Sequence, residues 1–169
     1  MVYNDPRRFG LLKLVARAEL DSIVELKGLG PEPFAKEFNA DYLWQVTRGR
    51  TAAIKNLLMD QRIVAGVGNI YASEILFRAR VRPSRRAGRV TRVELARIAT
   101  ITADVLREAI GSRGTTFRSY RDSQGQPGRF ASKLRVYDRE GQSCFECAAP
   151  IRAIVLGQRS SFFCPHCQK

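Results

Sequence analysis

Four cysteines stand near the end of the chain in two knuckles of the same spacing, and they restrict its folding more than any other feature. Sixteen residues separate the first Cys-x-x-Cys knuckle from the second. Each tight turn presents two thiolates, and two such turns complete the tetrahedral shell of a structural zinc ion. Two disulfides or clustered free thiols are the alternatives, but paired knuckles in a chain that opens without a secretory leader favour metal. We therefore expect one Zn²⁺, bound by Cys144, Cys147, Cys164 and Cys167.

The spacer between the knuckles has room for two short strands. Residues 151–156 and 160–163 are mostly β-branched, aromatic or small, and they flank Gly157-Gln158-Arg159, a sequence typical of a hairpin turn. A further short strand is predicted at 134–137, leading into the metal site. We assign residues 132–169 to a zinc-ribbon-like β-hairpin finger with four cysteine ligands.

The charge of the chain is the next constraint. Lysine and arginine number 29 against 16 acidic residues, a net charge of +13, and 23 of the cations are arginine. Genome composition can explain arginine over lysine but not the net excess. A domain this basic most often binds nucleic acid, with a membrane surface or an acidic protein as lesser alternatives. No apolar run approaches the roughly 20 residues of a membrane span, so we expect a soluble protein.

The rest of the chain is predicted to be mainly α-helical. Apolar residues recur at helical spacing in four stretches, which are 40–47, 51–59, 69–79 and 91–110. We expect Thr51 and Asn69 to be N-caps. Thr91 and Glu94 have the spacing of a capping box, and Val93 falls on the stripe expected in the core. Residues 1–131 are assigned to this helical domain.

Two turns around Gly66-Val67-Gly68 join the second and third predicted helices. No strand precedes them and no third glycine follows at the right offset, which excludes a dinucleotide-binding fingerprint. The pattern fits a nucleic-acid-binding helical hairpin or a plain pair of packed helices equally well. The surrounding positive charge favours nucleic acid.

An arginine-rich run lies between the third and fourth predicted helices. Residues 78–97 contain eight arginines and one acidic residue, Glu94. Such a run can be a solvated face, and we give phosphate contact a small preference. Farther along, residues 119–128 are polar and glycine-containing, which is typical of a mobile loop that is either functional or disordered.

Three stretches together resemble formamidopyrimidine-DNA glycosylase: residues 5–10 (Asp-Pro-Arg-Arg-Phe-Gly), residues 66–74, and the cysteine quartet with Gln158-Arg159. The resemblance covers essentially the whole chain but only the C-terminal part of that family. It implies a helix–two-turns–helix domain followed by the zinc finger. Residues 1–15 would then be a remnant of an N-terminal domain or a linker.

The family removes oxidised purines, such as 8-oxoguanine and formamidopyrimidine, and cuts the strand by β,δ-elimination as a glycosylase and AP lyase. The damaged base must leave the stack for this chemistry. The resemblance therefore implies double-stranded damaged DNA as partner, a monomer, no membrane association, and a bacterial cytoplasmic location on the nucleoid.

Several residues match family positions that contact DNA. Asn69 and Arg159 would grip the phosphates beside the flipped nucleotide, and Arg159 would assist the δ-elimination as a catalytic residue. Arg50 and Tyr137 would be further backbone contacts.

Other matching positions concern the lesion itself. Arg7 would hydrogen-bond the orphaned cytosine and Phe9 would wedge into the duplex, although spacing alone favours a surface turn whose Phe9 packs on the core. The segment after Phe117 would fold over the damaged base. That segment includes Arg118, where many relatives have lysine, and the loop residues Ser119, Tyr120, Gly125 and Gly128.

The family's amine nucleophile is an N-terminal proline, closely followed by a glutamate, whereas this sequence opens Met1-Val2-Tyr3. Without that amine no Schiff base forms. We expect this polypeptide to bind damaged DNA with little excision of its own. The alternative is a non-enzymatic zinc-ribbon protein that binds nucleic acid.

Overall fold

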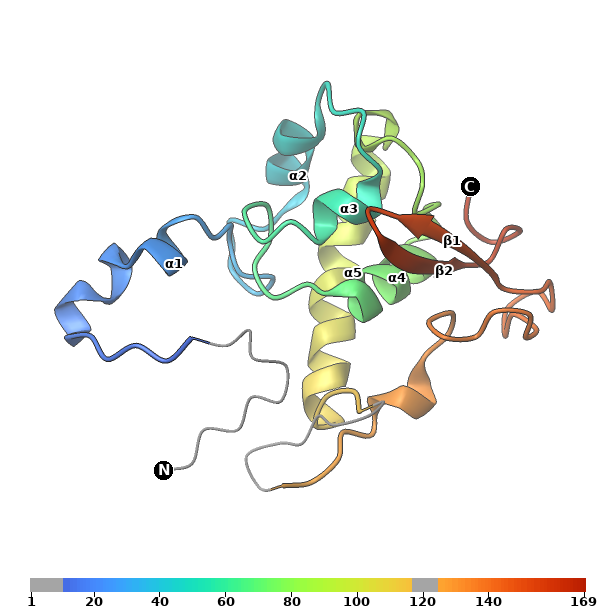
Figure 1. Cartoon of the computed structure of the whole chain (residues 1–169). Coiled ribbons are helices and arrows are strands. Elements are labelled where there is room, and N and C mark those ends of the chain that lie inside the picture. The colour runs from blue at the N-terminus through green and yellow to red at the C-terminus, as the bar shows by residue number, and fades with distance from the viewer. Residues whose placement is uncertain (1–10, 117–124) are drawn as a thin grey trace.

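The computed structural model describes residues 11–116 and 125–169, and it is mainly α-helical with one small β-hairpin (Figure 1). The α-helices are α1 (Val24–Lys27), α2 (Ala40–Thr47), α3 (Ile54–Leu58), α4 (Asn69–Arg78) and α5 (Arg92–Gly111). Three 3₁₀ turns are η1 (Arg17–Ser22), η2 (Ala87–Arg89) and η3 (Phe130–Lys133). The strands are β1 (Arg152–Leu156) and β2 (Arg159–Phe163). The expected fold class, a helical body followed by a hairpin finger, is confirmed.

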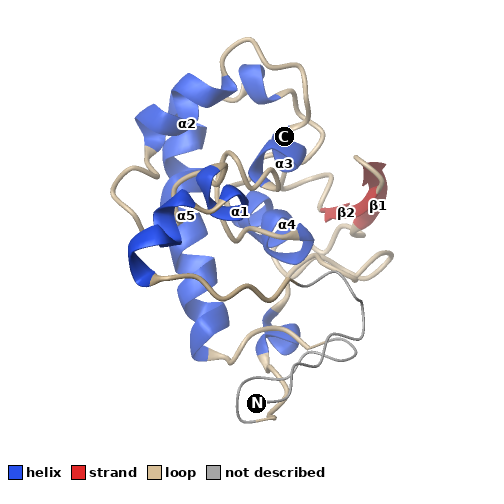
Figure 2. Cartoon of the chain, turned by 60° about the vertical axis from the view of Figure 1, so that its left-hand side comes forward, coloured by secondary structure: helices blue, strands red, loops and turns tan. Residues whose placement is uncertain are grey.

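Helix α5 runs through the helical body and packs against α2 and α4 (Figures 1 and 2). The predicted capping box is present, since Thr91 Oγ1 accepts from the Glu94 N–H and the Glu94 carboxylate accepts from the Thr91 N–H. Leu95, Ile98 and Val105 are fully buried on its inner face. Val93 was wrongly expected in the core: it lies on the outer side of the first turn and is 72% exposed.

The two other predicted N-caps are wrong. Helix α3 begins at Ile54, three residues after Thr51, because its first N–H groups bond to a distant loop: Ile54 N donates to the Arg85 carbonyl and Lys55 N to the Pro83 carbonyl. At α4 the N-cap is Gly68, and Asn69 is the first helical residue. The side chain of Asn69 is therefore available for other contacts.

The β-hairpin is confirmed, with a tighter turn than predicted. Leu156 pairs with Arg159, so Gly157 and Gln158 alone form the turn. Their φ angles of +54° and +61° are those of a type I′ turn. The shorter turn makes Arg159 the first residue of β2, at the tip of the hairpin.

The strand predicted at 134–137 is absent from the structure. Residues 130–133 form η3, and the segment that follows bends across α4 instead of pairing with a strand. One core cluster surrounds α5 and includes Leu134; a second lies under the metal site and includes Phe77, Val136 and Ile151. Within residues 11–116 and 125–169, no helix is long and apolar enough to span a bilayer.

Candidate nucleic-acid interface

The start of α4 and the β-hairpin meet at Asn69. Its Oδ1 atom accepts a hydrogen bond of 2.5 Å from Lys55 Nζ, and its Nδ2 donates to the Ser160 carbonyl at 3.1 Å and to the Tyr137 hydroxyl at 3.4 Å. Ser160 directly follows Arg159 in β2. Three residues that the resemblance singled out, Asn69, Tyr137 and Arg159, are thus brought together from distant parts of the chain.

Lys55 holds this junction from beneath. Its side chain is fully buried, and its ammonium donates to Asn69 Oδ1, to Ser161 Oγ at 2.7 Å and to the Ser160 carbonyl at 3.1 Å. Burial lowers the pKa of Lys55 to about 8, and the positive charge of Arg159 acts on this pKa in the same direction. The hairpin tip is thereby tied to the first turn of α4.

Sequence reasoning did not single out Lys55. Its neighbours Ile54, Leu57 and Leu58 are buried, and α3 is only five residues long. A lysine inside so short an apolar helix was an available signal, because a lysine is almost never fully buried without a partner.

Glu74 makes a second connection between the helical body and the finger. Its carboxylate is fully buried and accepts from three consecutive backbone N–H groups, those of Arg135, Val136 and Tyr137, each at 2.9 Å. A carboxylate is the acceptor with enough lone pairs for this bend. These bonds place Tyr137 next to Asn69 and replace the strand predicted there.

The remaining predicted contact residues are dispersed. Arg50 is exposed in the loop between α2 and α3 and is not part of the Asn69 junction. Gly125 and Gly128 lie at the second stem of the loop, where Gly128 N donates to Thr116 Oγ1 at 2.8 Å. The other predicted residues lie outside the described part of the chain: Arg7, Phe9, Arg118, Ser119 and Tyr120.

The four cysteines form a compact cluster. Their Sγ atoms all lie within 4.8 Å of one another, with 4.0 Å between Cys144 and Cys167 and 3.5 Å between Cys147 and Cys164. Zinc–sulfur bonds of about 2.3 Å in a tetrahedron place the sulfurs about 3.8 Å apart. The cysteines are not joined by disulfides. The set therefore fits one tetrahedral zinc ion with no open position, as in a structural site.

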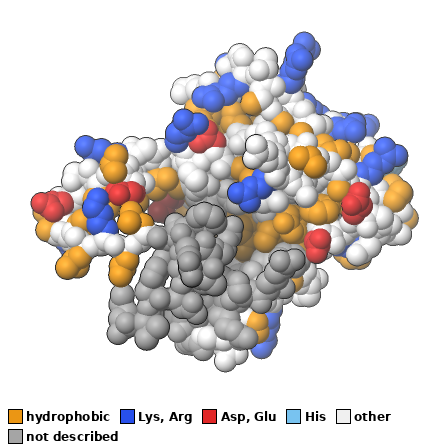
Figure 3. All heavy atoms as spheres, in the orientation of Figure 1, with side chains coloured by type: hydrophobic (Ala, Val, Ile, Leu, Met, Phe, Trp, Pro, Cys, Tyr) orange, Lys and Arg blue, Asp and Glu red, His pale blue; other side chains and the backbone are white. Residues whose placement is uncertain are grey.

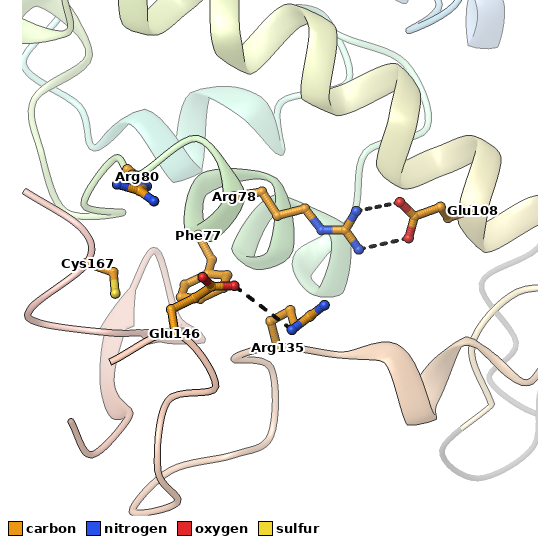
Figure 4. A pocket seen from close by; sticks show the side chains of 7 residues that line it. All are labelled: Phe77, Arg78, Arg80, Glu108, Arg135, Glu146 and Cys167. Carbon is orange, nitrogen blue, oxygen red and sulfur yellow. Dashed lines mark hydrogen bonds and ion pairs between the residues drawn. The ribbon is translucent and has the colours of Figure 1, made fainter. Parts of the chain in front are cut away.

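A pocket of about 320 Å³ lies at the opposite end of α4 from Asn69 (Figure 4). Arg78 forms a bidentate ion pair with Glu108, at 2.7 and 2.9 Å, and Arg135 lies 4.0 Å from Glu146. The Arg78 guanidinium lowers the pKa of Glu108. These groups mostly neutralise one another where the finger joins the helices, so the pocket offers little to a polyanion.

The fold and the site define a class of protein: a helix–two-turns–helix body with a four-cysteine zinc finger. Comparison with protein-family models finds both parts. Residues 29–121 match the formamidopyrimidine-DNA glycosylase H2TH domain, and residues 141–169 match the zinc finger found in FPG and IleRS.

Similar proteins support the same assignment. The formamidopyrimidine-DNA glycosylase of Syntrophotalea carbinolica is 52% identical over 98% of this chain, and that of Pectobacterium carotovorum is 48% identical over 99%. The crystal structure of the MutM (FPG) protein from Thermus thermophilus superposes with a TM-score of 0.89 at 43% identity, covering 97% of this chain and 62% of that one. The chain belongs to the formamidopyrimidine-DNA glycosylase family.

The chain spans about 61% of the length of these curated relatives. A solved complex between the Lactococcus lactis Fpg and DNA containing an abasic site also superposes, with a TM-score of 0.84 at 30% identity, over 92% of this chain and 57% of that one.

Proposed function

We propose that this chain is the DNA-binding portion of a base-excision-repair glycosylase and AP lyase for oxidised purines such as 8-oxoguanine and formamidopyrimidine. One observation carries the proposal: Lys55 donates to both the Asn69 amide oxygen and the Ser160 carbonyl, and so connects the first turn of α4 with the hairpin tip in one unit. The similarity to Fpg structures solved with damaged DNA supports it.

The unit is suited to a DNA phosphate. Helix α4 makes its first intrahelical bond between Ala72 N and the Gly68 carbonyl, so the preceding N–H groups at its start have no helical partner. A helix N-terminus with free N–H groups favours an anion. The exposed Arg159 at the hairpin tip adds a fork of donors for phosphate oxygens. Asn69 and Arg159 would grip neighbouring phosphates, with Tyr137 at the edge of the grip.

The remaining roles follow from the family resemblance. Arg159 would assist δ-elimination, and Arg50 would contact the backbone. Arg7 would hydrogen-bond the orphaned cytosine, and Phe9 would wedge into the gap left in the duplex. The segment that includes Arg118, Ser119, Tyr120, Gly125 and Gly128 would cover the damaged base. We further propose that residues 1–131 and 132–169 are the functional units, that the protein is a monomer, and that it acts in the cytoplasm on the nucleoid.

The zinc ion would have a structural role. The four thiolates would hold it at the base of the hairpin and so fix the positions of Ser160 and Arg159. Bound zinc supplies folding energy to a module too small to build a large core.

Fluorescence anisotropy with labelled duplexes tests the proposed function. The chain is titrated against a duplex with one tetrahydrofuran abasic analogue and against an intact duplex of the same sequence. We expect tighter binding to the damaged duplex. Equal affinity for both would instead support a general zinc-ribbon nucleic-acid binder, and no binding to either would exclude both functions.

A further inference from the structure

The arginine run at 78–97 is divided by the structure into groups with different surroundings. Arg78 pairs with Glu108, Arg85 with Glu94 and Arg92 with Asp41, while Arg82 lies over the ring of Phe163. Arg86 and Arg89 are exposed, and within the described residues their guanidinium groups make no hydrogen bond or ion pair. Ion pairs and hydrogen bonds within the fold therefore do not explain why these two positions carry arginine.

Backbone contacts fix the loop that carries Arg86 and Arg89. Arg86 forms an antiparallel bridge with Ala53, and Ala87 N donates to the Ala52 carbonyl at 2.8 Å. Gly88 N donates to the Arg50 carbonyl at 3.0 Å, and a Cβ atom at Gly88 would lie only 3.0 Å from that oxygen. The close approach leaves little room for a side chain at Gly88, and it brings Arg50 beside this loop.

The loop adjoins the proposed phosphate grip across α3. Ala53, which bridges Arg86, directly precedes α3. Asn56, inside α3, lies beside the hairpin turn, because a Cβ atom at Gly157 would be only 2.9 Å from its Nδ2 atom. Three residues of helix correspond to about 4.5 Å of rise. Figure 3 shows Lys and Arg side chains over the upper part of the molecule, where these loops lie in Figure 1.

We propose that Arg50, Arg86 and Arg89 form a second phosphate-binding strip, which extends the DNA contact from the hairpin tip across α3 to the duplex that flanks the lesion. This inference rests on the proposed function. The strip contacts only backbone phosphates, so it raises affinity for damaged and intact duplex alike and carries no lesion information. Duplex DNA is the favoured occupant because the strip continues the proposed phosphate contact of Asn69 and Arg159 and presents exposed guanidinium groups.

The salt dependence of binding tests the strip. Each neutralised phosphate contributes about 0.9 to the slope of log affinity against log salt. The double variant Arg86→Ser/Arg89→Ser is therefore expected to lower that slope by about two. Between 50 and 200 mM salt, its loss of affinity should be roughly tenfold smaller than that of the wild type. The ratio of affinities for the abasic-analogue and intact duplexes should stay as in the wild type.

The matched control is Arg80→Ser/Arg97→Ser. Arg80 and Arg97 come from the same run and are also exposed, and their replacement removes the same charge. Both, however, line the surface beside His166 and Cys167 at the far end of α4. A clearly smaller change in slope is expected for this pair. Arg86→Lys/Arg89→Lys should recover most of the slope, because the charge remains, and thermal melts should show all variants folded.

Equal slopes for the two serine pairs, with lesion preference intact, would overturn the strip and leave the proposed function standing. Absence of duplex binding by the wild-type chain would overturn both. A fall in lesion preference in Arg86→Ser/Arg89→Ser would also contradict the inference, because it would place these residues at the damaged nucleotide.

Discussion

The Nζ atom of Lys55 lies 2.5 Å from Oδ1 of Asn69, and this contact joins α3 to the start of α4 beside the β-hairpin. The same ammonium donates to Ser160 and Ser161 of β2. The orientation of Asn69 and the position of the hairpin tip therefore depend on one buried side chain.

Replacing Lys55 with methionine should disconnect Asn69 at the start of α4 from the hairpin tip that carries Arg159. The change leaves Asn69 Oδ1 and Ser161 Oγ without their donor, which costs about 1–3 kcal/mol for each group that remains buried and unsatisfied. We expect a lower free energy of unfolding in urea and at least tenfold weaker binding to the abasic-analogue duplex. Lys133→Met, which removes an exposed lysine from η3, is the control and should change the free energy of unfolding little. Wild-type affinity in Lys55→Met would show that the junction does not organise DNA contact.

The ionisation of Lys55 predicts a pH dependence of stability. The pKa of Lys55 is about 8 in the folded chain against an ordinary value of 10.5. Between pH 8 and pH 10.5, Lys55 is mostly protonated in the unfolded chain and mostly neutral in the folded chain. Because the unfolded chain binds more protons in this range, the contribution of Lys55 to the free energy of unfolding rises with pH. We expect the difference in free energy of unfolding, wild type minus Lys55→Met, to increase across that range. A difference that stays flat or falls would contradict the buried, desolvated ammonium.

Glu74→Gln should loosen the connection between helices and finger. The amide has one acceptor oxygen and turns N–H donors toward at least one of the backbone N–H groups of Arg135, Val136 and Tyr137. A loss of about 2–3 kcal/mol is expected, as for a buried charged acceptor. Chemical denaturation measures it, with the exposed Glu140→Gln as control. Equal stability of the two variants would mean that the three hydrogen bonds contribute nothing net.

Removing zinc should unfold the finger, and with it the proposed phosphate contact of Arg159, while most of the helical body stays folded. The cysteine cluster fits one ion, and metal binding at such sites is coupled to folding. We expect one zinc per chain by elemental analysis. A chelator, or Cys164→Ser, should abolish tight DNA binding while most of the helical circular dichroism signal remains. Unchanged affinity in Cys164→Ser would show that the hairpin tip is not needed.

Local chemistry made much of the fold predictable. The zinc ligands follow from cysteine spacing, and the start of α5 follows from Thr91 and Glu94, which are three residues apart. Thr51 failed as an N-cap because the start of α3 is completed by carbonyls at Pro83 and Arg85. Periodicity within a helix does not reveal such a distant partner.

The organisation of the site was less predictable for the same reason. Lys55 contacts Ser160 and Ser161, more than one hundred residues away, and Glu74 contacts a segment about sixty residues away. The resemblance indicated Asn69 and Arg159, but only the structure shows what joins them.

The most direct test of the account is the affinity of Asn69→Ala, Arg159→Ala and the double variant for the abasic-analogue duplex, measured in one salt concentration. We predict that each single change weakens binding by about tenfold, as expected for a charge-assisted or phosphate hydrogen bond. We also predict that the double variant loses less than the product of the two, because both residues belong to the unit joined by Lys55. Wild-type affinity in either single variant would contradict a shared phosphate grip, and strictly multiplicative losses would contradict the coupling.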